Sequence, residues 1–132
     1  AGPMPLAYVG LGEPFVLVFF GPVAVAGTYA LMSGEVSAPS VLAGLQIGGL
    51  ATVLIAINNL RDIEGDRRAR KMTPAARFGP RAGKLICLAM LFAPFVGGLA
   101  WLSFGRTLAA SVPMAALVLA VPLGRELWDT PA

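Results

Sequence analysis

Four long apolar runs dominate this sequence, at residues 13–31, 40–57, 85–104 and 107–123. Folded as helices with a rise of about 1.5 Å per residue, the runs would each be roughly 26–30 Å long, close to the thickness of a bilayer's hydrocarbon core. Charged residues make up only 13% of the chain, about half the share found in soluble domains. The sequence therefore predicts an all-α fold, a polytopic transmembrane helical bundle.

Basic residues are distributed unevenly among the segments that connect the runs. Eight of the ten Lys and Arg residues lie between positions 61 and 84, whereas the segment 32–39 has none. An excess of Lys and Arg in a short loop marks that loop as cytoplasmic. We therefore expect a cell inner (cytoplasmic) membrane protein with the 58–84 loop in the cytoplasm. Membrane lipid is an expected partner, and nucleic acid is not.

Residue types that are scarce also limit the chemistry and the packing. The chain has no histidine, so it offers neither a histidine metal ligand nor a histidine base. Its single cysteine, Cys87, lies in an apolar run, which excludes a disulfide framework. Gly44 and Gly48 suit close helix packing, although such glycines are also ordinary in membrane helices. Pro22 is expected to kink the first run.

The stretch NNLRDIEGDRRARK, residues 58–71, follows the second run directly. If that helix continues past the membrane surface, Asn58, Asp62 and Asp66 lie four residues apart and share one face. Oxygen ligands suit Mg²⁺, which commonly uses one or two carboxylates together with substrate phosphates. The stripe therefore predicts a partial Mg²⁺ site that a phosphorylated ligand would complete.

Six cations surround this stripe and offer two interpretations. The first interpretation is a phosphate site, because arginine binds phosphate oxygens through two parallel hydrogen bonds and lysine binds them as a point charge. The second interpretation is that the loop is basic only because it lies on the cytoplasmic side of the membrane, and that its acidic residues only pair with neighbouring arginines. A non-catalytic helical subunit whose loop binds anionic lipid is then the alternative. The cations are Arg61, Arg67, Arg68, Arg70, Lys71 and Arg77.

Two blocks of the sequence resemble the UbiA superfamily of intramembrane prenyltransferases. The block NNLRDIEGDRRARKMTPAARFG, residues 58–79, resembles the second aspartate motif of that superfamily. The block GPMPLAYVGLGEPFVLVFFGPVAVAGTY, residues 2–29, is similar to the stretch before and through the fifth span. Both blocks are most similar to the group that prenylates 1,4-dihydroxy-2-naphthoate in menaquinone synthesis. Alternatives within the superfamily use another aromatic acceptor, such as 4-hydroxybenzoate or a chlorophyll precursor.

This resemblance implies a fold, a reaction and a set of site residues. The family fold is a nine-helix bundle in which two aspartate motifs face each other and hold Mg²⁺ and a prenyl diphosphate. Loss of diphosphate gives an allylic cation that the aromatic acceptor attacks, with expulsion of CO₂ from dihydroxynaphthoate. By position, Asn58, Asp62 and Asp66 match the metal ligands, and the two aspartates are the catalytic candidates. Lys71, Arg61 and Arg77 match residues that bind the diphosphate.

The sequence also departs from the pattern of that group. Arg70 stands where the group has glycine, and Pro74 stands where it has leucine and disfavours helix at Thr73. No motif of the NDxxDxxxD type, the first aspartate motif, occurs in the chain. By resemblance the four runs correspond to spans five to eight. We therefore expect this chain to work with a missing N-terminal half that carries the first motif.

Overall fold

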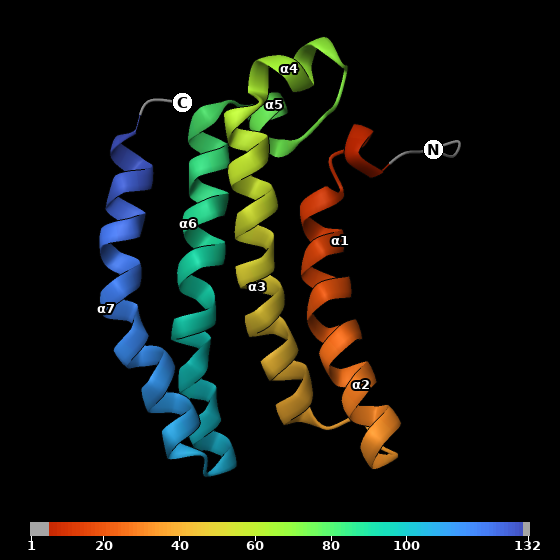
Figure 1. The fold of residues 1–132 in the computed structure, drawn as a ribbon, viewed down its shortest axis with the longest axis vertical. Coiled ribbons are helices and arrows are strands. Elements are labelled where there is room, and N and C mark those ends of the chain that lie inside the picture. The colour runs from red at the N-terminus through yellow and green to blue at the C-terminus, as the bar shows by residue number, and fades with distance from the viewer. Residues whose placement is uncertain (1–5, 131–132) are drawn as a thin grey trace.

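Four long helical rods lie side by side in the structure, as Figure 1 shows. The computed structural model describes residues 6–130, and within that range it has no β-strand. All four rods are long and apolar enough to cross a membrane. The predicted all-α, polytopic helical bundle is therefore confirmed. The rods are Gly12–Ser33, Ala38–Arg61, Pro80–Phe104 and Thr107–Asp129.

Several shorter elements make up these rods and the connections between them. The first rod comprises α1 (Gly12–Val18), the π-helical turn η2 (Phe19–Val23) and α2 (Ala24–Ser33). The other rods are α3 (Ala38–Arg61), α6 (Pro80–Gly97) with the 3₁₀ segment η3 (Gly98–Phe104), and α7 (Thr107–Asp129). Two short helices, α4 (Ile63–Arg68) and α5 (Pro74–Phe78), follow α3, and η1 (Leu6–Tyr8) precedes α1. Figure 1 places α4 and α5 together at one end of the bundle.

Helices α3 and α6 extend beyond the apolar runs because both begin in polar sequence that favours a helix start. At the start of α3, the hydroxyls of Ser37 and Ser40 each accept a hydrogen bond from the other residue's backbone amide, which forms a capping box. Helix α6 begins at Pro80, and proline suits the first helical turn because its missing N–H would have no partner there. The region 58–84 is mostly helical, because it holds the end of α3, the whole of α4 and α5, and the start of α6.

The first rod and α3 approach each other at glycine residues. A Cβ atom on Gly44 would lie 2.7 Å from the Cα of Pro22, and one on Gly48 would lie 2.8 Å from the Cα of Gly21. Gly21 leaves helical geometry, with φ −98° and ψ −110°, next to the kink at Pro22. The small residues thus let the two backbones touch, as they do in other packed membrane helices.

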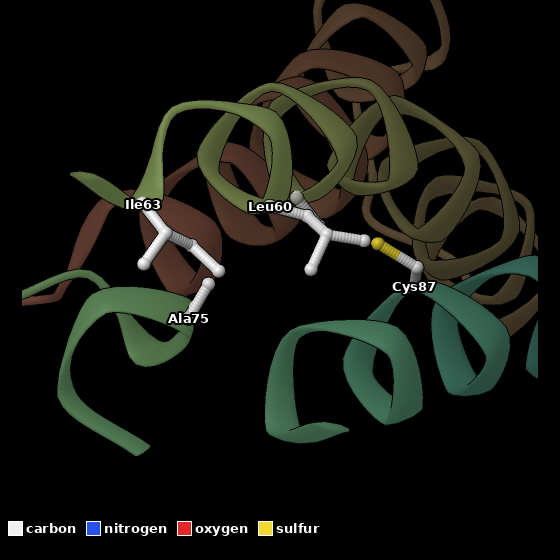
Figure 2. Close-up of a cluster of buried hydrophobic side chains, with 5 residues drawn as sticks. Leu60, Ile63, Ala75 and Cys87 are labelled. Atoms are coloured by element: carbon white, nitrogen blue, oxygen red, sulfur yellow. The ribbon is translucent and has the colours of Figure 1, made fainter. Parts of the chain in front are cut away.

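A small apolar cluster lies at the α4–α5 end of the bundle. It consists of Ala56, Leu60, Ile63, Ala75 and Cys87, all of them buried. Figure 2 shows the side chain of Leu60 directed toward Cys87 and that of Ile63 directed toward Ala75. These contacts join the end of α3 to α4, α5 and α6. The polar stretch after α3 is therefore fixed in place by the buried side chains of this cluster.

Candidate functional site

The chain bends where α3 ends, and the acidic residues on the two sides of the bend differ in exposure. Helix α3 ends at Arg61, and Asp62 has φ −101° and ψ 20° before α4 begins. Asn58 and Asp62 are exposed, whereas Asp66 is buried. The α-helix is thus interrupted within the predicted stripe, although the amides of Asp62 and Asp66 still donate to the carbonyls of Asn58 and Asp62, at 3.0 and 2.8 Å. The break lets Ile63 pack into the apolar cluster, and this packing orients α4.

The end of α4 turns the chain back across Asp66. Arg70 adopts the left-handed conformation, with φ 57°, and its amide donates to the carbonyl of Arg67 at 3.1 Å. The amide of Lys71 donates to the carbonyl of Asp66 at 2.8 Å. These two bonds form a Schellman motif, a common way to satisfy the last carbonyls of a helix. This backbone turn brings Lys71 beside Asp66.

Both carboxylate oxygens of Asp66 have a protein partner. Lys71 Nζ donates to Oδ1 at 3.1 Å, and Thr73 Oγ1 donates to Oδ2 at 3.2 Å. The side chain of Asp66 is 7% exposed and that of Lys71 is 38% exposed, so solvent reaches this ion pair mainly from the lysine side. A carboxylate has about four acceptor positions, which leaves Asp66 capacity for a further ligand.

Thr73 connects Asp66 to the start of α5. Its backbone is extended, with ψ 151°, as Pro74 after it requires. Its hydroxyl accepts a hydrogen bond from the amide of Ala76 at 3.3 Å while donating to Asp66. One hydroxyl therefore caps α5 and positions a buried carboxylate.

Asp62 lies at the surface, beside two cations. Arg61 donates from Nε to Oδ1 at 3.2 Å and from Nη2 to Oδ2 at 3.3 Å. The hydrogen bonds from Arg61 lower the pKa of Asp62 below its usual value, and the positive charges of Arg61 and Lys71 lower it further. Asp62 is therefore ionised at neutral pH and accessible to a ligand.

The structure brings together only part of the predicted phosphate-binding set. Arg61 and Lys71 lie beside the two aspartates. Arg77 lies on α5, with its guanidinium 5.1 Å from the centre of the Phe78 ring. Within residues 6–130, Arg77 forms no ion pair. Its charge is thus available on the surface but is not directed at the aspartates.

The oxygen atoms of this site suit a metal ion that arrives with its ligand. No group of three or more His, Cys, Asp or Glu side chains in the described part of the chain is arranged to hold a metal. Asp62 offers an exposed carboxylate, Asn58 offers an amide one turn earlier, and Asp66 lies on the following helix. Mg²⁺ commonly binds one or two carboxylates and takes its other ligands from water and phosphate. The donor set fits Mg²⁺ on those terms.

Sequence reasoning missed two polar residues that the structure makes important. Thr73 stands directly before a proline at a helix start, which is a recognisable cap signal. Glu13 begins the first apolar run and accepts a hydrogen bond from Asn59 at 2.8 Å. An ionisable side chain in a membrane segment is costly without a partner, and that was the available signal for Glu13.

Comparison with known proteins identifies the chain's relatives. The model of the UbiA prenyltransferase family matches residues 3–130. The chain belongs to this family. The resemblance carried by residues 58–79 and 2–29 is thereby confirmed, and with it a multi-pass membrane protein. No solved structure is a significant match to the chain.

Individual relatives cover most of this chain but only part of their own length. A 1,4-dihydroxy-2-naphthoate octaprenyltransferase of Haemophilus influenzae is 40% identical over 122 residues, which is 92% of this chain and 39% of the relative. The Escherichia coli protein of the same name is 38% identical over 99 residues, covering 67% of this chain and 32% of the relative. Human UbiA prenyltransferase domain-containing protein 1 is 28% identical over 125 residues, covering 95% and 37%. The chain thus spans about two fifths or less of these relatives.

Proposed function

We propose that this chain forms part of a Mg²⁺-dependent aromatic prenyltransferase. The enzyme would transfer a polyprenyl group from a prenyl diphosphate to 1,4-dihydroxy-2-naphthoate, with decarboxylation, in menaquinone biosynthesis. One observation carries the proposal: Asp62 and Asp66 follow an apolar rod, and the charge of Lys71 acts on both. The printed names of the bacterial relatives support dihydroxynaphthoate as the acceptor.

The site residues would have different roles in binding the diphosphate. Asn58, Asp62 and Asp66 would hold Mg²⁺, which when bound neutralises phosphate oxygens and stabilises a leaving diphosphate. Lys71 would add a point charge, and Arg61 could turn its two donors from Asp62 to the phosphate. That exchange costs little because an exposed ion pair contributes little stability.

The reaction balances without a base, because the attacking ring carbon loses CO₂ instead of a proton. The bond between the prenyl carbon and the diphosphate oxygen breaks, and the diphosphate leaves with the electron pair. The ring carbon that bears the carboxylate attacks the allylic cation and forms the new carbon–carbon bond. The carboxylate then leaves as CO₂, and its bonding electrons restore the aromatic ring. A cavity within a helical bundle would keep water away from the cation.

The proposal includes a location and a partner segment. The 58–84 region would lie on the cytoplasmic side of the inner membrane, since it holds most of the Lys and Arg residues. The four rods would correspond to spans five to eight of a nine-helix bundle. A segment bearing the first aspartate motif would face Asp62 and complete the diphosphate site.

An assay of the full-length protein in membranes tests this proposal. With Mg²⁺ and a prenyl diphosphate, we expect prenylated product and one CO₂ for each dihydroxynaphthoate consumed. Product from 4-hydroxybenzoate instead, without CO₂ release, would favour another acceptor. If no acceptor is prenylated and anionic vesicles bind equally well after Asp62→Asn, the non-catalytic lipid-binding subunit would replace the proposal.

A further inference from the structure

A buried carboxyl group lies outside the aspartate cluster. Glu13, in the first turn of α1, is 6% exposed. Its Oε1 accepts a hydrogen bond from Asn59 Nδ2 at 2.8 Å, which ties the first rod to α3. Its Oε2 is also buried, and no described residue forms a hydrogen bond with it. Oε2 is therefore a strong hydrogen-bond acceptor without a donor inside the described part of the bundle.

A purely structural tie to Asn59 does not explain why this residue is a glutamate. A glutamine would accept the same hydrogen bond through its single amide oxygen. Burying a carboxyl oxygen without a donor is unfavourable, and more so when the group is charged. Ionisable groups in membrane segments are rare and are functional by default. The unused oxygen of Glu13 thus points to a ligand that supplies a donor.

A cavity of about 270 Å³ adjoins Glu13. Thr52 also lines this cavity, but its hydroxyl already donates to the carbonyl of Gly48 at 2.7 Å. The other lining side chains are apolar and include Ile86 and Met90. This volume is near the lower end of ligand pockets, which run from about 300 to 1,000 Å³. The cavity therefore suits a small ring system with a hydroxyl at one end.

The cavity also lies next to the segment that carries the aspartate cluster. Pro74 forms part of its wall. The preceding residue, Thr73, donates its hydroxyl hydrogen bond to Asp66. A ring held against Glu13 would therefore sit close to the carboxylate that the proposed function assigns to Mg²⁺ and diphosphate.

We propose that Glu13 Oε2 accepts a hydrogen bond from a hydroxyl of the aromatic diol and positions its ring in this cavity. The inference rests on the proposed function for the identity of the acceptor. Glu13 is then a substrate-binding residue, because its pairing with Asn59 occupies Oε1 and leaves Oε2 for the ligand. The apolar wall receives the ring, and the carboxyl group selects for a hydroxyl over an ether.

Binding of dihydroxynaphthoate and of its two monomethyl ethers to the full-length protein tests the inference. A methoxy group cannot donate, so we expect the wild type to bind one ether at least about tenfold more weakly than the diol. In Glu13→Gln the amide oxygen stays with Asn59, so an amide nitrogen, which cannot accept a hydrogen bond, takes the place of Oε2. The preference should then fall to within about threefold or reverse. Glu64→Gln makes the same change on the surface and should leave the preference intact.

Each outcome either supports or overturns the role of Glu13. Equal binding of diol and ethers by the wild type would overturn it, as would an unchanged preference in folded Glu13→Gln. If that variant does not fold, Glu13→Asp should bind the diol more weakly and keep the hydroxyl preference; a lost preference would count against the inference. If the protein catalyses prenyl transfer but binds the diol and its ethers equally well, only the role of Glu13 is refuted. If the protein prefers the diol but transfers no prenyl group, only the proposed reaction is refuted. If it binds neither the diol nor the ethers, both proposals are refuted.

Discussion

Single side chains after α3 hold the predicted site together, and Thr73 is the clearest case. Its hydroxyl accepts from the amide of Ala76 and donates to Asp66, so it serves a helix cap and a buried carboxylate together. Arg70 contributes through its backbone, which must be left-handed for Lys71 to reach Asp66. Both effects can be separated from the chemistry by stability measurements.

Replacing Thr73 tests the double role of its hydroxyl. Thr73→Ala removes the cap and one donor to a buried carboxylate, so the free energy of unfolding should fall by about 1–3 kcal/mol. Thr73→Ser keeps the hydroxyl and should stay within about 0.5 kcal/mol of the wild type. Unfolding of the purified protein in detergent provides the measurement. Equal loss in both variants would show that the methyl group, not the hydroxyl, matters.

Replacing Arg70 tests the left-handed turn. A side chain in this conformation costs about 1–2 kcal/mol, and glycine avoids that cost but loses more backbone entropy on folding. Arg70→Gly should therefore raise the stability by up to about 1 kcal/mol. The neighbouring Ala69 has φ −79°, so Ala69→Gly brings only the entropy cost and should lower stability. A loss of stability in Arg70→Gly as large as in Ala69→Gly would contradict the turn.

At the scale of elements, the bundle depends on close contact between the first rod and α3. Gly44 and Gly48 face the kinked segment at Gly21 and Pro22, where backbones meet without intervening side chains. The same pair of rods carries the hydrogen bond between Glu13 and Asn59. A change at the glycines should therefore disturb both the packing and the cavity beside Glu13.

An alanine substitution measures how tight this contact is. A Cβ on Gly48 would overlap the carbonyl oxygen of Leu17 and the backbone of Gly21, so Gly48→Ala should cost about 1–3 kcal/mol. Gly27 lies in α2, where an added Cβ would meet no neighbouring atom within 4 Å, and Gly27→Ala should leave stability unchanged or slightly higher. The thermal midpoints of the two variants give the comparison. Similar midpoints would mean that the rods do not touch at Gly48.

Hydropathy and spacing predicted the four rods, whereas the site needed information that local sequence does not contain. Apolar length is a local property, so the membrane helices could be read directly. The bend at Asp62 depends on Ile63 packing against Ala75, which follows later in the chain. The contact between Glu13 and Asn59 joins residues 46 positions apart. No periodic pattern marks either contact in advance.

The whole molecule presents an apolar outer surface with a basic region at one end. Large side chains such as Leu31 and Leu108 are 90% and 78% exposed, which suits contact with hydrocarbon or with further helices. The basic residues gather instead around α4 and α5. From this asymmetry we expect the bundle to insert with the aspartates on the cytoplasmic side.

Cysteine labelling in intact cells tests this orientation. Glu35 and Ala69 are exposed and lie at opposite ends of the rods, while the native Cys87 is buried and contributes little background. An impermeant maleimide should label Glu35→Cys directly and Ala69→Cys only after the membrane is permeabilised. Direct labelling of Ala69→Cys would place the aspartates outside the cell.

The most direct test of the central claim is the Mg²⁺ dependence of prenyl transfer by the full-length protein. Asp62→Asn removes an exposed charge without disturbing the core, so kcat/KM should fall by at least about 100-fold at every Mg²⁺ concentration while the thermal midpoint stays unchanged. Glu64→Gln removes an exposed charge from the same segment, where Glu64 pairs with Arg67, and should stay within about threefold of the wild type. If Asp62→Asn keeps a wild-type rate and Mg²⁺ dependence, Asp62 is not a metal ligand and the assignment of the site fails.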